Sequence, residues 1–306
     1  QIFDELNNPE VREEIHAQFP KKSIHRRNTG YAVDELLKAE LFEGKEKFNF
    51  CKLLAGSEGT LAFTTEIKIS LDPLPDPVEI VVAAHFATIH ESMKSAQVAM
   101  KHPATAVELM DKIILDCTKE SIEYSKNRYF VEEDPEAILM IEFRGKTLEE
   151  AMAKGEALVA DLKAGGYGYA YPIIEPEKVA SAWALRAAGL GLLGNIPGDP
   201  KAVACIEDTA VDIEDLADYI DEVDAMMEGF NQKPVHYAHA GAGEIHLRPI
   251  LDLKKAEDVA EFYKISLASA QLVKKYQGSL SGEHGDGRVR AAFIPLMVGE
   301  KNYELF

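Results

Sequence analysis

Residues 281–288, SGEHGDGR, place a carboxylate and an imidazole side by side at Glu283 and His284. Three glycines surround the pair, and glycine adopts backbone angles that other residues avoid and lets a ligand approach the main chain. Adjacent side chains point in different directions, so one of them can bind a metal while the other acts as a base. A solvated loop without a function has the same composition, and spacing alone does not exclude it.

A second group of polar side chains occupies residues 235–249, VHYAHAGAGEIHLRP, which include His239 and His246. Their spacing of seven puts them on opposite faces of an uninterrupted strand. The glycines at 241 and 243 lie between them, and a bulge or tight reversal there would turn both imidazoles into one site. Glu283 would complete a His/His/Glu set of the kind that binds zinc-like ions and leaves one position open. We therefore expect His239, His246 and Glu283 to converge on one metal-sized site.

A third motif is GSEGTL at residues 56–61. Backbone N–H groups of such a turn form a cradle for an anion or for the edge of a ring. An ordinary tight turn into a strand has the same composition. The motif is neither G-x-G-x-x-G nor a Walker loop, so it predicts neither a Rossmann site nor an NTPase.

Composition narrows the class of protein. The chain has 306 residues, of which 46% are apolar, enough for two domains or for one large domain with a satellite. The formal charge of −19 argues against general binding to nucleic acid or to anionic membranes. No apolar run reaches the roughly 18 residues of a membrane span.

The cysteines indicate the compartment. Cys51, Cys117 and Cys205 are isolated and form no C-x-x-C motif, which disfavours a zinc ribbon or an iron–sulfur site within this chain. An odd, scattered set fits the reducing cytosol, so we expect a cytoplasmic protein.

Hydrophobic periodicity predicts the elements that must position these residues. After the turn at residue 56, alternation up to residue 71 predicts a half-buried strand with Ile67, Ile69 and Leu71 on one face. Three prolines in residues 72–77 then end any helix or strand and mark a domain boundary.

Beyond this boundary strands alternate with helices. Strands are expected at residues 78–86, 137–143, 168–174, 203–211 and from 234 onward. Helices are expected near residues 90–116, from a Thr147 N-cap to about 164, after an Asp212 N-cap, and at 254–276. This order predicts an α+β domain of two similar βαβ-type halves.

The three motifs together resemble a known family. They occur in the same order in FAD-linked oxidases of the vanillyl-alcohol oxidase superfamily, and NTGYAVDELL at residues 28–37 is similar to the segment before the flavin-contacting turn. The chain most resembles the bacterial D-2-hydroxyacid dehydrogenases, acting on D-2-hydroxyglutarate or D-lactate, that are fused to an iron–sulfur region. The resemblance implies the end of an FAD-binding domain at residues 1–76. An FAD-linked oxidase C-terminal domain of two ferredoxin-like βαβ halves would follow at 77–306. It also implies an internal fragment of a longer protein.

The resemblance also implies a role for each matched residue. The flavin would be contacted by the turn residues Gly56, Ser57, Glu58, Gly59 and Thr60. The divalent metal, zinc or manganese, would be bound by His239, His246 and Glu283. His284 matches the catalytic base, and Arg186 matches an arginine that clamps the substrate carboxylate, a task that suits a guanidinium.

Some positions depart from the family pattern. Ala242 and Glu244 stand where many relatives have Asp and Asn, a change shared by relatives with the iron–sulfur fusion. A lysine that contacts substrate in hydroxyglutarate enzymes corresponds here to Ile206 or Glu207, which leaves the substrate open. His236 lies outside the matched motif and is expected to tolerate substitution.

The function implied is that of part of an FAD-dependent oxidoreductase. A small-molecule D-2-hydroxyacid would become the 2-oxoacid with metal assistance and hydride transfer to flavin. Electrons would leave to an acceptor through an iron–sulfur cluster in a C-terminal region outside this chain. The isolated chain is expected to be inactive and to hold little FAD. Two alternatives remain, a metal-dependent hydrolase and a substrate-binding cap that is catalytically silent in isolation.

Overall fold

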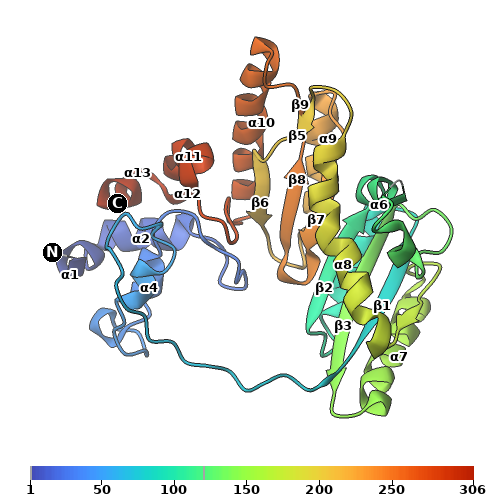
Figure 1. Ribbon diagram of the computed structural model, residues 1–306. Helices are drawn as coiled ribbons and strands as arrows, with labels where there is room; N and C mark the ends of the chain where they lie inside the picture. The colour runs from blue at the N-terminus through green and yellow to red at the C-terminus, as the bar shows by residue number, and fades with distance from the viewer. Residues whose placement is uncertain (1, 120) are drawn as a thin grey trace. The chain divides into compact units, whose positions relative to one another are not determined.

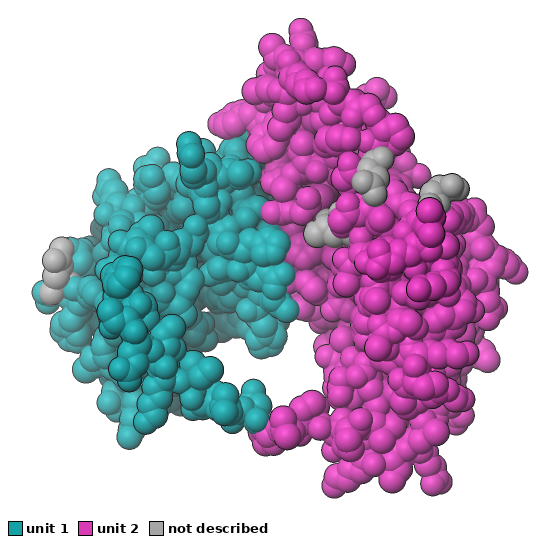
Figure 2. Space-filling view, in the orientation of Figure 1, with its two compact units in different colours: residues 1–72, 208–212, 266–306 teal, residues 73–207, 213–265 magenta. Residues whose placement is uncertain are grey.

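A computed structural model describes residues 2–119 and 121–306. The chain divides into two compact units, coloured separately in Figure 2. The first unit comprises residues 1–72, 208–212 and 266–306, and the second comprises residues 73–207 and 213–265. The sequence prediction assigned all of residues 77–306 to one domain, whereas here two later segments cluster with the N-terminal residues.

The described residues form helices at both ends of the chain and a mixture of strands and helices between them (Figure 1). The strands are β1 (Val78–Phe86), β2 (Ala106–Asp111), β3 (Ala137–Gly145), β4 (Ile173–Ile174), β5 (Lys201–Ala202), β6 (Ile206–Ala210), β7 (Val235–His239), β8 (Glu244–Arg248) and β9 (Ile250–Leu251). The helices up to residue 119 are α1 (Ile2–Leu6), α2 (Pro9–Gln18), α3 (Val33–Leu36), α4 (Cys51–Leu54), α5 (Ile89–Ala99) and α6 (Lys112–Lys119). The later helices are α7 (Leu148–Gly165), α8 (Pro176–Leu192), α9 (Leu216–Gly229), α10 (Ala256–Lys275), α11 (Gly287–Arg290), α12 (Ile294–Val298) and α13 (Glu300–Leu305). Short 3₁₀ turns are η1 (Glu40–Phe42), η2 (Ser125–Arg128), η3 (Leu193–Asn195), η4 (Ala240–Ala242) and η5 (Ala291–Phe293).

One seven-stranded sheet has the order β4-β1-β3-β2-β7-β8-β6. The elements β1, α5, β2, β3, α7 and β4 make the first half, and their strand order β4-β1-β3-β2 is that of a ferredoxin-like unit. The elements β6, α9, β7, β8 and α10 repeat the pattern, and after α10 the chain returns to bridge Ser279 with Ala210 beside β6. The pairing of β2 with β7 joins the two halves. The predicted α+β fold with two ferredoxin-like halves is confirmed.

Helices cover both faces of the first half of the sheet. Ile80 and Val82 face α7, where a Cβ added at Gly155 would lie 2.9 Å from Ile80, so the helix approaches the strand closely. Val81 and Ala83 point to the opposite face and join a fully buried cluster with residues of α6 and α8. Burying such side chains stabilises the fold by roughly 1.5–3 kcal/mol each.

Local signals place several elements as expected. The strand predicted at residues 78–86 matches β1 residue for residue, because its continuous apolar run is buried on both faces. Thr147 is the N-cap of α7, and its hydroxyl accepts a hydrogen bond from the backbone N–H of Glu150 at 3.2 Å. Gly166 ends this helix in the left-handed conformation, with φ of +72°.

In the first unit the N-terminal helices pack against the C-terminal ones. Asn8 caps α2 by accepting from the N–H of Glu10 at 3.0 Å, and Pro9 follows at the first helical position. The buried side chains of α2 then contact α12 and α13. This packing gives the unit a core drawn from both ends of the described chain.

The prediction of a half-buried strand up to residue 71 is wrong. Residues 61–76 form no strand and run as an extended stretch (Figure 1). Phe63 is 92% exposed and Ile67 is 75% exposed. A strand needs a neighbour to pair its backbone groups, and none of the described segments pairs with this one.

Other predicted boundaries also change. The helical expectation for residues 90–116 missed β2, a strand paired on both sides within the sheet. The helix expected after Asp212 begins only at Leu216, and Asp212 instead accepts a hydrogen bond from the hydroxyl of Ser23. The strand predicted at 168–174 is reduced to the two residues of β4, with a separate bridge from Ala170 to His85.

Candidate active site

The hairpin of β7 and β8 brings two predicted metal ligands together in the second unit. The reversal expected near residues 241–243 is present as η4, followed by Gly243 with φ of +69°. Tyr237 pairs with His246 across the hairpin, which puts His239 and His246 on the same face. Their rings lie 5.1 Å apart between centroids and nearly perpendicular, at 87°.

Each of these imidazoles is oriented through Nδ1. His239 Nδ1 lies 2.9 and 3.0 Å from the two carboxylate oxygens of Glu108, and His246 Nδ1 bonds to the carbonyl oxygen of Glu207. A carbonyl or an ionised carboxylate can only accept, so both Nδ1 atoms carry the hydrogen. In a neutral imidazole with hydrogen on Nδ1, the lone pair is on Nε2, and this is the form of imidazole that binds a metal ion.

Arg186, on α8, belongs to the same cluster. Its guanidinium forms an ion pair with Glu108, and its Cζ lies 4.1 Å from the ring centroid of Tyr237. The Nε atom is buried and has no hydrogen-bond partner among the described residues. The guanidinium is thus held on one edge and stacked on one face, which fixes the orientation of a group suited to binding carboxylates.

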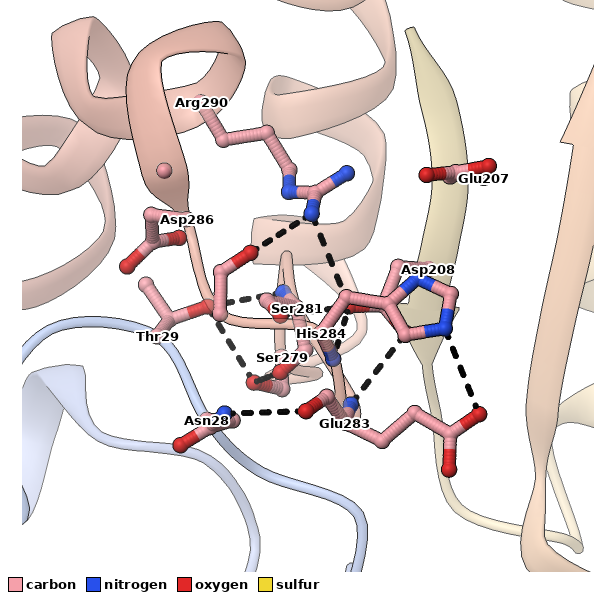
Figure 3. Close-up of polar contacts among 12 residues, drawn as sticks. Asn28, Thr29, Glu207, Asp208, Ser279, Ser281, Glu283, His284, Asp286 and Arg290 are labelled. Atoms are coloured by element: carbon pink, nitrogen blue, oxygen red, sulfur yellow. Dashed lines mark hydrogen bonds and ion pairs between the residues drawn. The ribbon is translucent and has the colours of Figure 1, made fainter. Parts of the chain in front are cut away.

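A second cluster, in the first unit, orders the residues around Glu283 and His284 (Figure 3). The fully buried carboxylate of Asp208 accepts from the backbone N–H groups of Glu283 at 3.2 Å and His284 at 2.9 Å, and from the hydroxyl of Ser281. The carbonyl of Asp208 accepts from Gly282 N–H at 2.6 Å. Asp208 therefore holds the backbone of residues 282–284 through three N–H groups.

The side chains of this stretch have partners within the first unit. Glu283 forms an ion pair with Arg26, and its carbonyl accepts from the side-chain amide of Asn28 at 3.1 Å. His284 Nε2 lies 3.5 Å from a carboxylate oxygen of Glu283, and the His284 side chain is 46% exposed. The imidazole is thus accessible while its backbone is held.

The GSEGTL turn contacts the same stretch through Glu58. This carboxylate accepts from the N–H of Asp286 at 2.8 Å and from the N–H of Gly287 at 3.1 Å. Asp286, whose N–H donates to Glu58, is itself a buried acid. Burial raises the pKa of Asp286 to about 6, although the N–H of Gly30 and the charge of Arg290 lower it. Glu58 therefore joins two predicted site segments by hydrogen bonds to the backbone.

Backbone geometry explains the glycines of the turn. A Cβ at Gly56 would lie 2.2 Å from Oδ1 of Asn28, and its φ is +82°. At Gly59, with φ of +74°, a Cβ would meet nothing within 4 Å. The hydroxyls of Ser57 and Thr60 close the turn by donating to the carbonyls of Leu54 and Ser57, at 2.8 and 2.7 Å. The turn is preorganised, and its Gly59 side is open to a ligand.

The expectation that His236 tolerates substitution does not fit its surroundings. Its side chain is buried, and its Nε2 lies 2.8 Å from Oδ1 of Asp224. Its backbone N–H donates to Asp111 at 2.7 Å, and Asp111 also accepts from the N–H of Ile114 at the start of α6. His236 points to the other face of β7 from His239 and contributes to the packing of the second unit.

The predicted site residues therefore form two preorganised groups. His239, His246 and Arg186 lie together in the second unit, while Glu283, His284 and residues 56–60 lie in the first. Glu108 was not predicted as a site residue because β2 was expected to be helical. Asp208 was not predicted either, although two adjacent acids within a predicted strand, Glu207 and Asp208, are a signal that could have been followed.

Comparison with known proteins decides the family. A family model described as FAD linked oxidases, C-terminal domain, matches residues 75–306. The chain belongs to this family. The resemblance to FAD-linked oxidases noted from the sequence is thereby confirmed.

Curated relatives of this chain include two bacterial enzymes named D-2-hydroxyglutarate dehydrogenase. The one from Pseudomonas putida is 32% identical over 94% of this chain and 28% of its own length. The one from Escherichia coli is 31% identical over 95% of this chain and 29% of its own length. The chain therefore spans less than a third of the length of these relatives.

A solved structure has the same fold. p-Cresol methylhydroxylase with substrate bound aligns with a TM-score of 0.53 and 11% identity, over 76% of this chain and 50% of that one. At this identity the likeness concerns the fold alone. Among the described residues of this chain, no helix has the length and apolar character needed to cross a membrane.

Proposed function

We propose that this chain supplies the substrate side of an FAD-dependent oxidoreductase that converts a D-2-hydroxyacid to the 2-oxoacid. The observation that carries the proposal is the pair His239 and His246, whose rings lie 5.1 Å apart and which each have Nδ1 bonded to an oxygen. Membership of the FAD-linked oxidases and the names of the relatives support flavin chemistry on a 2-hydroxyacid. D-2-hydroxyglutarate is accordingly the first substrate to test.

The residues present fit a divalent cation and a flavin. His239, His246 and Glu283 would hold the ion, zinc or manganese, because two imidazoles and a carboxylate are common donors for such ions. Residues 56–60 would contact the flavin, and the open space at Gly59 leaves room for a ring edge beside the backbone. When bound, the ion lowers the pKa of a coordinated hydroxyl and the flavin accepts a hydride.

Side chains of this chain bind the substrate and remove its proton. Arg186 binds the substrate carboxylate and fixes the direction of the α-carbon. His284 takes the proton of the α-hydroxyl while the electron pair of the Cα–H bond leaves as hydride, so that C–OH becomes C=O. One proton on His284 and one hydride on the acceptor balance the two-electron oxidation. Electrons would then leave through an iron–sulfur group outside residues 1–306.

The test uses the intact protein that carries this chain. Anaerobic addition of D-2-hydroxyglutarate or D-lactate should bleach the flavin absorbance, and the L-enantiomers should not. Removing the metal with a chelator should abolish the bleaching, and Mn²⁺ or Zn²⁺ should restore it. No bleaching by any D-2-hydroxyacid would overturn the proposal. Metal-dependent hydrolysis without flavin would instead favour a hydrolase, and substrate binding without turnover would favour a silent cap.

A further inference from the structure

Glu108 lies at the centre of the second unit's cluster, although no motif includes it. It occupies β2, where Leu109 pairs with Ala238 of β7, and this register sets Glu108 beside His239. One of its oxygens forms the ion pair with Arg186, and both lie within 3.0 Å of His239 Nδ1. Its side chain is only 14% exposed. One buried carboxylate therefore contacts both a predicted metal ligand and the predicted substrate clamp.

Arg186 and His239 both depend on Glu108 for their orientation. The guanidinium of Arg186 stacks on Tyr237 and donates to the carbonyl of Ala238 at 3.4 Å, so its plane is set by the sheet. Among the described residues, Glu108 provides the one ion pair of Arg186. For His239, the Glu108 carboxylate selects the tautomer with hydrogen on Nδ1.

We propose that Glu108 is a positioning residue that couples the metal ligand His239 to the carboxylate clamp Arg186. This inference rests on the proposed function. A single carboxylate orients both groups, so metal affinity and substrate affinity should change together when it is altered. A carboxylate with a purely structural role would change stability and leave both affinities as they were.

The test is Glu108→Gln in the intact protein. The amide keeps the shape of the side chain but removes its charge and one acceptor oxygen. We expect the dissociation constant for Mn²⁺, measured by electron paramagnetic resonance on chelator-treated protein, to rise by about 10–100-fold. The KM for D-2-hydroxyglutarate should also rise. Unchanged values for both would overturn the proposal.

Glu79→Gln is the matched control. Glu79 is also a partly buried carboxylate of the second unit, ion-paired with Arg144 and hydrogen-bonded to Trp183 at 2.9 Å. It should lower the melting temperature about as much as Glu108→Gln does, with Mn²⁺ affinity and KM unchanged. Equal losses of affinity in both variants would assign the effect to general destabilisation and overturn the proposal.

A double variant covers the case in which Glu108→Gln does not fold. Glu108→Gln with Arg186→Gln leaves no unpaired buried charge. Its KM should equal that of Arg186→Gln alone, whereas its Mn²⁺ affinity should be lower than in that single variant. A KM above that of Arg186→Gln alone, or equal Mn²⁺ affinities in the two variants, would contradict the coupling.

Two further variants distinguish a failure of the proposed function from a failure of the inference about Glu108. His239→Ala should lose Mn²⁺ and Arg186→Gln should raise KM. If neither does so, the proposed site is wrong and the role of Glu108 falls with it. If both do so while Glu108→Gln behaves as wild type, only the present inference is overturned.

Discussion

The carboxylate of Asp208 accepts a hydrogen bond from the backbone N–H of His284 at 2.9 Å. The two residues are 76 positions apart in sequence, and Asp208 is fully buried. Because the same carboxylate also accepts from Glu283 N–H, a residue distant in the sequence holds the backbone of both Glu283 and His284. This acid on β6 restricts the flexibility that the glycine-rich composition predicts.

Asp208→Asn should therefore reduce both stability and turnover. The amide keeps one acceptor oxygen and points its NH₂ group at a backbone donor, which leaves a buried N–H unpaired. We expect a loss of about 1–3 kcal/mol in the free energy of unfolding, and a lower kcat. Urea unfolding and steady-state kinetics measure the two effects. Asp212→Asn, outside this network, is the control, and an unchanged kcat in Asp208→Asn would reduce Asp208 to a structural role.

His284→Ala should lower kcat and kcat/KM together, by about 10²–10⁴-fold, because proton removal is needed in the transition state rather than for binding. Metal content, measured by elemental analysis, should stay at the wild-type level. The neighbouring variant Glu283→Ala should lose metal as well as turnover. Near-normal turnover of every tested D-2-hydroxyacid by His284→Ala would show that another group is the base.

His236 should make stability depend on pH. Burial lowers the pKa of His236, but hydrogen bonds and charges from Asp111 and Asp224 outweigh burial and raise it to about 9. Because this folded-state pKa lies above the usual 6.5, the stabilisation is fully present below about pH 6.5 and is lost as pH rises through about 9. It amounts to at most about 3 kcal/mol.

The measurement is the melting temperature of wild type and His236→Gln between pH 6 and 10. The difference between them should be largest at pH 6 and should shrink toward pH 10. His25→Gln, at an exposed position, is the control and should show little difference at any pH. A wild-type advantage that is constant with pH would refute the ion-pair explanation.

Gly56→Ala should distort the GSEGTL turn. The new Cβ would lie 2.2 Å from Asn28 Oδ1, on a backbone with φ of +82° that costs a residue with a side chain roughly 1–2 kcal/mol. We expect a lower melting temperature and a lower ratio of flavin to protein absorbance in the intact protein. Gly191→Ala near the end of α8, where a Cβ would meet nothing within 4 Å, should leave both quantities unchanged or improved. If Gly56→Ala keeps its full flavin content, the assignment of this turn to the cofactor site is wrong.

Interactions between residues close together in the sequence were enough to predict many of the elements. The apolar run at Val78–Phe86 predicts a buried strand because either face of it must be covered, and Thr147 starts α7 because its hydroxyl satisfies an N–H of the first turn. The reversal between His239 and His246 was also predictable, since only a kink can turn residues of odd spacing to one face. These features depend on residues close together along the chain.

The remaining features were decided by pairing between distant segments. Ile67 and its neighbours alternate like a strand, yet among the described residues nothing pairs with them, so they stay extended and exposed. Glu108 meets His239 across 131 positions of sequence, and Asp208 meets His284 across 76. No periodicity records such contacts, because they arise only when β2 pairs with β7 and when the chain returns beside β6. The sequence alone determined which residue types could do the chemistry, and the tertiary structure decided which acids orient them.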